Sequence, residues 1–369
     1  MLLRIRTLVV KELLAVWRDP KSRFILIGPP LIQMVIFSFA ATLEVKNVPI
    51  AILNKDYGTH GRDLIARLQG SPNFTRIEYL SGNSDITPAI DARRALMVVH
   101  IGPDFSRNLD AGRPADVQLI LDGRRSNAAQ LVAGYATAIV GSYNEELARD
   151  RRIPPPPSEV VPRIWFNPNM DPRWSTVPGL VAILTTMMGI MITGLSVARE
   201  RELGTFEQLL VSPLSPTEII LGKTVPALII GTAEATGMTL VGMYVFGVPF
   251  RGEAALFYLS MVVYLGAVIG VGLFISSLAR TQQQAILGAF VFMVPAILLS
   301  GFASPIENMP PWLQFLTRAN PVRYFMTIVK GVFLKAMSPD EILDNLWPLV
   351  VIAATTLATA AWLFRRRAA

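Results

Sequence analysis

Two features of this 369-residue chain have residue types that could do chemistry, and the first is the triplet Gly-Lys-Thr at 222–224. Such a triplet ends the phosphate-binding loop G-x-x-x-x-G-K-[ST], in which the backbone and the lysine hold nucleotide phosphates. The first glycine of that pattern would fall at Thr217, and no strand-like run precedes it. The sequence therefore predicts no ATPase site in this chain. Lys223 is instead explained as a positive charge at the cytoplasmic end of a membrane helix.

The second feature is Glu234, a single carboxylate inside the apolar run 224–248. An ionisable side chain at membrane depth is costly, so it is a functional candidate by default. Glu234 is therefore predicted to line a substrate path or a gate. The alternative is a structural glutamate that is protonated, or that pairs with Thr232, Thr236 or a neighbouring helix.

The remaining polar residues favour no catalytic or metal site. Asp56, Asp63 and Asp122 stand at the ends of short apolar runs, where aspartate commonly forms turns. No nucleophile is spaced with a base. The two histidines, His60 and His100, and the absence of cysteine argue against zinc, haem and thiolate sites. We expect no catalytic residue, no metal and no cofactor in this chain.

Apolar segments dominate the elements around these residues. Hydrophobic residues make up 52% of the chain and charged residues 17%, whereas a soluble domain has about 25% charged residues. Crossing about 30 Å of hydrocarbon takes about 20 apolar residues in a helix. Six spans are predicted, at residues 24–43, 176–197, 224–248, 256–279, 285–303 and 346–364.

The positive charges predict the orientation of these spans. Thirteen Lys and Arg residues lie near the two termini and on the loops of the same side, against five on the short loops of the other side. Cytoplasmic loops carry an excess of such residues. Both termini are therefore expected in the cytoplasm, with residues 1–23 forming an interfacial helix on the inner leaflet. The net charge of +7 then reflects membrane orientation and gives no support for nucleic-acid binding.

The insert between the first two spans, residues 44–175, is then extracytoplasmic. Short β-rich runs at 48–53, 75–80, 95–101 and 116–121 are bounded by turn residues. Helical patterns at 61–68 and 126–149 lie between or after these runs. The alternation predicts a small α/β domain, and the four prolines at 154–157 form a stiff spacer back to the membrane.

The loop between the second and third spans, residues 198–223, carries the most informative motif. Its order E-x-x-x-G-T-x-E-x-x-x-x-S-P is followed by Gly-Lys at the next span. Thr205 offers a helix cap, and a short amphipathic helix from there to the Ser-Pro pair could lie along the membrane surface.

This motif resembles the coupling segment of type-2 ABC transporter permeases, the class that includes drug and O-antigen exporters. In that class the segment docks on the ATPase subunit, and a helix of this kind could insert into a groove of the partner through its apolar side chains. The residues to which the resemblance gives this docking role are Glu200, Gly204, Thr205, Phe206, Glu207, Leu209, Leu210, Ser212 and Pro213. A second likeness is Phe-Asn-Pro at 166–168, followed by Val-Pro-Gly at 177–179. The resemblance covers essentially the whole chain and is strongest over residues 165–330. It is closest to the subgroup with a large extracytoplasmic domain between spans 1 and 2.

The resemblance implies an all-α six-helix transmembrane bundle with an inserted extracytoplasmic α/β domain. It also implies a bacterial inner-membrane exporter that moves a drug-like, lipidic or other amphipathic substrate. Two cytoplasmic ABC ATPase subunits would hold the ATP and magnesium, and a second permease copy or a related permease would complete the complex. The bilayer and a periplasmic adaptor protein are further partners compatible with this class.

Two further segments of the 176–369 region have structural predictions. Gly266 and Gly270 form a small-xxx-small face that allows close helix packing, within one protomer or between two. Residues 304–335 are too short for two full spans, so a re-entrant pair of half-helices is expected on the outer side.

Two other functions remain open on the residues alone. An ion-coupled secondary transporter could use Glu234 as its proton site. A membrane-anchored sensor could bind a ligand through the outer domain. An adjacent gene for a P-loop ATPase would favour the exporter over both.

Overall fold

A computed structural model describes residues 2–18, 20–40, 47–153, 163–202, 204 and 215–368. The chain forms two compact units. One consists of Met1–Thr42 and Arg163–Ala369, and the other of Leu43–Pro162. The second unit ends at Pro162, and the next helix begins at Pro172.

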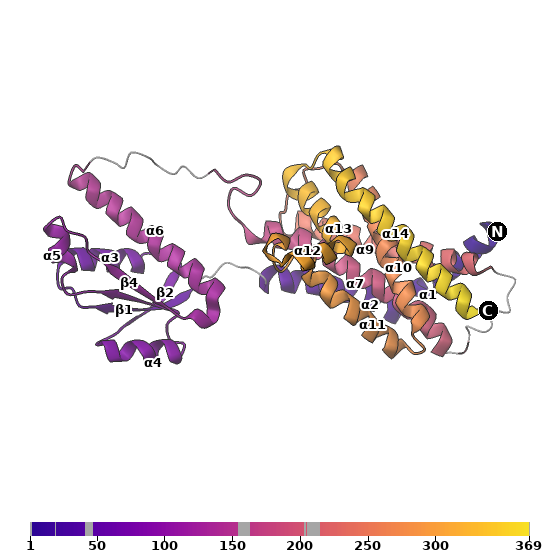
Figure 1. The fold of residues 1–369 in the computed structure, drawn as a ribbon, viewed down its shortest axis with the longest axis horizontal. Coiled ribbons are helices and arrows are strands. Elements are labelled where there is room, and N and C mark those ends of the chain that lie inside the picture. Colours follow the sequence, from indigo (N-terminus) through magenta and orange to yellow (C-terminus); the bar gives the residue numbers. More distant parts are fainter. Residues whose placement is uncertain are drawn as a thin grey trace. The chain divides into compact units, whose positions relative to one another are not determined.

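The unit Leu43–Pro162 is built on a four-stranded sheet (Figure 1). The strands have the order β2-β1-β3-β4, in which β1 is parallel to both neighbours and β4 is antiparallel to β3. All four strands predicted from the sequence are confirmed, with small shifts at their ends. Their bounds are β1 (Val48–Asn54), β2 (Phe74–Tyr79), β3 (Met97–Ile101) and β4 (Val117–Leu121).

Helices cover both faces of this sheet, and the alternation of side chains along β1 sets the division. Ile50 and Ile52 pack with α3 (Thr59–Gln69) and α6 (Ser126–Asp150), whereas Ala51 and Leu53 face the α4 side. Both faces of a mostly parallel sheet are therefore buried, as this architecture requires. Two short helices complete the unit, α4 (Ile86–Asp91) and α5 (Phe105–Asp110).

The other unit is helical, and each of the six predicted spans overlaps one of its helices. These are α2 (Pro20–Ala40), α7 (Pro172–Glu202), α9 (Pro216–Tyr244), α10 (Ala254–Leu278), α11 (Gln282–Leu298) and α14 (Pro339–Ala368). Among the described residues, α7, α9, α10 and α14 are long and apolar enough to cross a membrane. The prediction of six full spans is thus met in part. The apolar stretches of α2 and α11 are shorter, at Ile27–Phe39 and Gln282–Leu298.

The core of this unit lies around α7 and α10, the two most buried of the four long helices. The rings of Tyr264 on α10 and Phe325 stack with centroids 4.1 Å apart, and Phe257 stacks on Phe325 at 6.4 Å. The Tyr264 hydroxyl is satisfied by Thr186 on α7 and by the Ala182 carbonyl oxygen at 3.2 Å. Stacked rings and a paired hydroxyl fix these helices in register.

Helix α10 also packs closely on α14 through its small residues. A Cβ atom on Gly270 would lie 2.4 Å from Thr356 Oγ1 and 2.8 Å from the Leu357 nitrogen, whereas one on Gly266 would meet Ala353 at 3.8 Å. Thr356 Oγ1 donates a hydrogen bond to the Ala267 carbonyl oxygen across this contact at 3.1 Å. The small-residue face therefore packs within one protomer.

The segment 304–335 forms short helices, α12 (Pro311–Leu316) and α13 (Pro321–Lys330), followed by a π-helical turn at Gly331–Lys335. Helix α13 contacts α7, α10 and α14 and buries Phe325 among them. The segment is thus helical and attached to the core, while its re-entrant position in a membrane stays a prediction.

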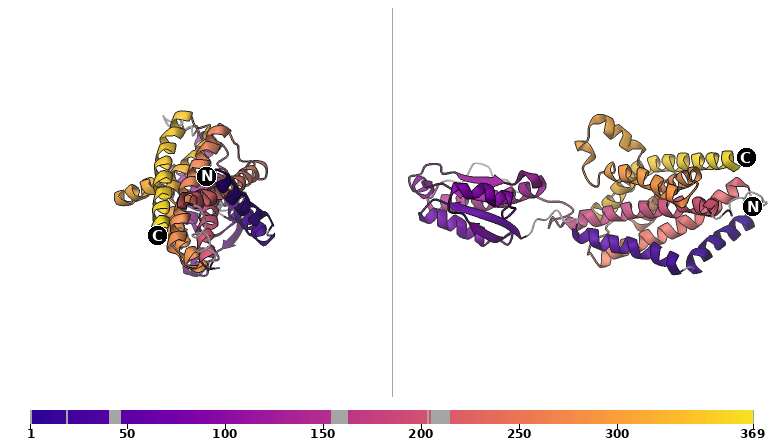
Figure 2. Two further views of the ribbon diagram at one scale, coloured as in Figure 1. Left: turned by 90° about the vertical axis from the view of Figure 1, so that its right-hand side faces the viewer. Right: turned by 90° about the horizontal axis from the view of Figure 1, so that it is seen from below.

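The first helix, α1 (Leu2–Arg18), and α2 meet at an angle and together form a V against α9. The view from below shows the two indigo and violet helices with the apex of the V turned away from the bundle (Figure 2). Both arms contact α9.

Candidate coupling site and substrate pocket

A buried lysine joins three helices at the end of the unit where α9 begins. Lys223 Nζ on α9 lies 2.9 Å from Glu200 Oε1 on α7 and 3.7 Å from Glu12 Oε1 on α1. It also donates a hydrogen bond to Ser196 Oγ at 2.9 Å. The Lys223 side chain is 6% exposed. We call Lys223, Glu200, Glu12 and Ser196 the lysine hub.

Local sequence signals place this lysine. Helix α9 begins with a capping box, in which Ser215 Oγ accepts from the Glu218 nitrogen at 3.3 Å and Glu218 Oε2 accepts from the Ser215 nitrogen at 2.8 Å. Pro216 follows this cap in the first turn of the helix, where proline is well suited. Two turns later, a Cβ on Gly222 would lie 2.9 Å from Leu8. The glycine lets α1 approach α9 closely enough for Glu12 to reach Lys223.

The hub adds to the sequence-based explanation of Lys223, which placed it as a positive charge at the cytoplasmic end of a helix. The structure buries it beside two carboxylates from distant segments, so it is held by ion pairs. Nothing in the local sequence around 222–224 indicates those partners.

The last turn of α7 reaches further helices through the residues after Glu200. Arg201 donates to the Ser277 and Ala279 carbonyl oxygens at the end of α10, at 2.9 and 3.1 Å. Glu202 Oε2 accepts from the Gln282 nitrogen at the start of α11, at 2.9 Å. A cation at a helix carboxyl end and an anion at a helix amino end both suit the helix dipoles. Local sequence signals do not indicate these hydrogen bonds of Arg201 and Glu202.

The predicted docking segment itself lies outside the described residues. This applies to Thr205, Phe206, Glu207, Leu209, Leu210, Ser212 and Pro213. Of the predicted set, Glu200 belongs to the lysine hub, and Gly204 has φ +71°, a left-handed conformation that favours glycine. The structure therefore describes the two flanks of the segment, α7 and α9, which the hub joins.

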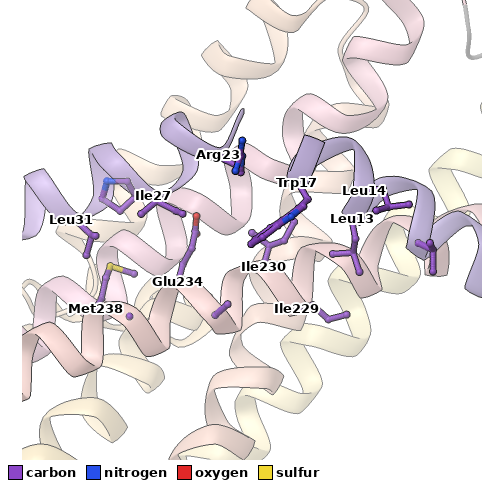
Figure 3. Close-up of a pocket in the computed structure, with 14 residues that line it drawn as sticks. Leu13, Leu14, Trp17, Arg23, Ile27, Leu31, Ile229, Ile230, Glu234 and Met238 are labelled. Carbon is purple, nitrogen blue, oxygen red and sulfur yellow. The ribbon is translucent and has the colours of Figure 1, made fainter. Parts of the chain in front are cut away.

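A pocket of about 650 Å³ lies between the V of α1 and α2 and the adjoining stretch of α9 (Figure 3). Apart from Glu234 and Arg23, its lining is apolar or aromatic. The lining residues are Val10, Leu13, Leu14, Trp17, Arg23, Ile27, Pro30, Leu31, Ile229, Ile230, Ala233, Glu234, Gly237 and Met238.

Glu234 has no hydrogen-bond partner in the part of the chain that the structure describes. Both of its carboxylate oxygens are buried and unpaired. The Thr236 hydroxyl instead donates to the Thr232 carbonyl oxygen of its own helix, at 2.7 Å. The pairing with Thr232 or Thr236 that served as the structural alternative is therefore absent here.

The polar residues of the other unit have structural roles. Asp56 accepts from the Ser106 hydroxyl at 2.5 Å and from the Ser106 nitrogen at 3.2 Å. Asp122 caps the turn before α6, and its hydrogen bond from Arg124 holds the pKa of this carboxyl below its ordinary value. His100 pairs with Gln118 across the sheet. In the described residues, no three His, Cys, Asp or Glu side chains are grouped to hold a metal.

Comparison with known proteins agrees with this architecture. Residues 21–362 match the model of the family described as ABC-2 family transporter protein. The chain is 50% identical over 364 residues to the probable multidrug ABC transporter permease YbhR of Escherichia coli K12, covering 99% of both chains. It is 31% identical to the probable multidrug ABC transporter permease YbhS of the same strain, covering 99% of this chain and 97% of the relative. It is 29% identical to the inner membrane transport permease YhhJ, covering 91% and 92%. The chain is thus a membrane protein that belongs to the ABC-2 transporter family.

Proposed function

We propose that this chain is the membrane-embedded permease subunit of an ATP-driven exporter and that a separate ABC ATPase supplies the hydrolysis. Family membership supports the transport role, and the multidrug names of two relatives support an amphipathic substrate. The full-length match favours this function over a secondary transporter or a sensor.

The observation that carries the coupling part of the proposal is the lysine hub. It joins α7 and α9, the helices on either side of the segment 203–214, and ties both to α1. A force that a partner applies to that segment would reach three helices at once. Arg201 and Glu202 would pass it on to α10 and α11. The docking residues predicted from the sequence would make the contact with the ATPase.

The proposed complex has two ATPase subunits and two permeases, which are copies of this chain or a related pair. All six hydrophobic helices would lie in the bacterial inner membrane, with both termini in the cytoplasm and the α/β unit outside. The short helices of 304–335 would enter the outer leaflet. The exposed apolar side chains of α14 and α11, such as Trp347 and Phe290, would face lipid or the second permease.

The test of this function is the nucleotide chemistry of the purified chain with and without its partner. Without an ATPase, the chain should neither bind nor hydrolyse ATP, because it lacks a phosphate-binding loop. Co-expression with a P-loop ATPase encoded beside it should yield a stable complex that hydrolyses ATP. ATP binding by the chain alone in equilibrium dialysis, or failure of every neighbouring ATPase to co-purify, would contradict the proposal.

A further inference from the structure

The pocket that contains Glu234 combines one buried carboxylate with apolar walls. Its volume of about 650 Å³ lies within the range of about 300–1,000 Å³ that small-molecule sites occupy. We propose that this pocket binds an amphipathic organic cation, with the positive charge against Glu234 and the apolar body between α1, α2 and α9. The proposal rests on the exporter function and names the substrate class and the site.

The sign of the charge follows from Glu234. It is the acidic residue among the fourteen that line the pocket, and in the described structure no donor reaches either carboxylate oxygen. An ionised carboxylate in apolar surroundings is costly unless a cation or hydrogen-bond donors compensate it. Among the described residues no donor contacts this carboxylate, so a cationic ligand would provide the missing partner.

Arg23 is the other charged lining residue, and its position differs from that of Glu234. Its side chain is exposed, and its guanidinium lies 5.9 Å from the centroid of the Trp17 ring. Figure 3 shows both side chains in the lining, Arg23 on α2 and Glu234 on α9. Solvent and ions screen an exposed charge more strongly than a buried one. Glu234 therefore determines which ligand charge the pocket favours, and Arg23 weakens that preference.

The walls indicate how the ligand arrives. Leu14, Ile27 and Ile229 line the pocket and are each more than two-fifths exposed, at 43%, 56% and 48%. They lie on helices of the hydrophobic unit, so the outer rim of the pocket borders the lipid side of these helices. A molecule dissolved in the membrane can reach Glu234 from that side without crossing the bundle. Trp17 also lines the pocket and is 70% exposed.

The pocket and the lysine hub share two helices. Leu13 on α1 lines the pocket, and Glu12 beside it reaches Lys223 on α9. On α9, Lys223 and Glu234 are held by the same continuous helix. A ligand that spreads or closes the V against α9 would therefore act directly on the contacts of the hub, and so on the proposed coupling segment.

The test measures binding of tetraphenylphosphonium, a permanent lipophilic cation, to the complete transporter in phosphatidylglycerol nanodiscs without nucleotide. Triphenylphosphine oxide, a neutral molecule of similar shape, is the comparison ligand. Glu234→Gln should weaken tetraphenylphosphonium binding by about tenfold or more and leave the neutral ligand within about twofold. Arg23→Gln should strengthen binding of the cation, and Glu234→Asp should retain most of it.

These opposite signs separate the proposal from a folding defect, because misfolding would weaken binding in both charge variants. Ile230→Ala removes apolar wall and should weaken both ligands. Glu307→Gln, at an exposed turn outside the pocket, should change the affinity for neither ligand. Equal tetraphenylphosphonium affinity in wild type and Glu234→Gln would overturn the proposal.

A lipid competition experiment tests whether the pocket binds a lipid headgroup. If tetraphenylphosphonium binding disappears when phosphatidylethanolamine is added to the nanodiscs, the site holds lipid ammonium groups and the assignment to a transported cation is overturned. Unchanged tetraphenylphosphonium binding supports the assignment to a transported cation.

Co-purification of the ATPase, measured on the same samples, separates this inference from the proposed function. Loss of the ATPase with retained, Glu234-dependent cation binding refutes the proposed function alone, whereas the reverse result refutes this inference alone.

Discussion

The Nζ atom of Lys223 lies 2.9 Å from Oε1 of Glu200, which joins α9 to α7 across the segment that is expected to dock on the ATPase. The side chains are 6% and 16% exposed. Removing one partner of a buried ion pair leaves the other charge uncompensated, whereas removing both can be nearly neutral. This asymmetry makes the relationship testable.

Lys223→Met is expected to destabilise the protein by about 3 kcal/mol and to reduce ATP-driven transport. The double variant Lys223→Met with Glu200→Met should recover much of the stability but not the transport. Thermal unfolding in detergent and transport assays would measure the two effects. The matched control is Lys335→Met. The 2.7 Å ion pair of Lys335 with Glu341 is more exposed, so its removal should lower the free energy of unfolding by less than about 1 kcal/mol. Equal losses of stability and of transport in Lys223→Met and Lys335→Met would refute a special role for the hub.

Leu209→Asp combined with Leu210→Asp should abolish co-purification with the ATPase. Both carboxylates would be buried without partners in the proposed interface, at a cost of several kcal/mol. Ile153→Asp, at an exposed position of the other unit, adds the same type of charge and should leave the complex intact. Normal ATPase binding and transport by the double variant would show that residues 204–213 are not the coupling element.

Gly270→Ala should lower stability, because the added Cβ would meet Thr356 Oγ1 at 2.4 Å and the Leu357 backbone at 2.8 Å. Gly134→Ala is the control in α6, where a Cβ meets nothing within 4 Å. That change should raise stability by up to about 1 kcal/mol through helix propensity. Thermal unfolding of the two full-length variants compares them. A stabilising effect at Gly270 would contradict the close packing of α10 on α14.

The α/β unit should lose part of its stability in acid through Asp122. Its pKa lies below the ordinary 3.8, chiefly because Arg124 hydrogen bonds to the ionised form. A carboxyl with a lowered folded-state pKa contributes stability above its unfolded pKa and loses it as the pH falls through the folded value. Amide exchange of the turn at Gly123–Arg125 should therefore speed up below about pH 4, after correction for intrinsic rates. Asp122→Asn should flatten this dependence, and Asp116→Asn should not.

The sequence predicted the elements better than it predicted their contacts. The strands of the α/β unit follow from alternating apolar residues between turns, and the start of α9 follows from its capping residues. These are local signals. The two shorter hydrophobic helices show that apolar runs predict helix ends less well. The run 285–303, for example, extends past the helix end at Leu298.

The contacts of Lys223 could not be predicted because Glu12 and Glu200 come from other parts of the chain, and no periodicity links them. Glu234 was identified from its depth in an apolar run, but the lack of a partner for its carboxylate depends on which helices surround it. In the sequence, Arg201 and Glu202 belong to a run of alternating charges at 199–202. Their bonds to the ends of α10 and α11 appear only once the helices are packed.

The central claim is that this chain exports its substrate with energy from a partner's ATP hydrolysis. Its most direct test is dye uptake into inside-out proteoliposomes that contain the chain with or without its ATPase. With a panel of cationic and neutral amphipathic dyes, we expect uptake that requires both the ATPase and hydrolysable ATP and that survives a protonophore. Uptake that occurs without the ATPase, and that follows an imposed pH gradient, would contradict the account.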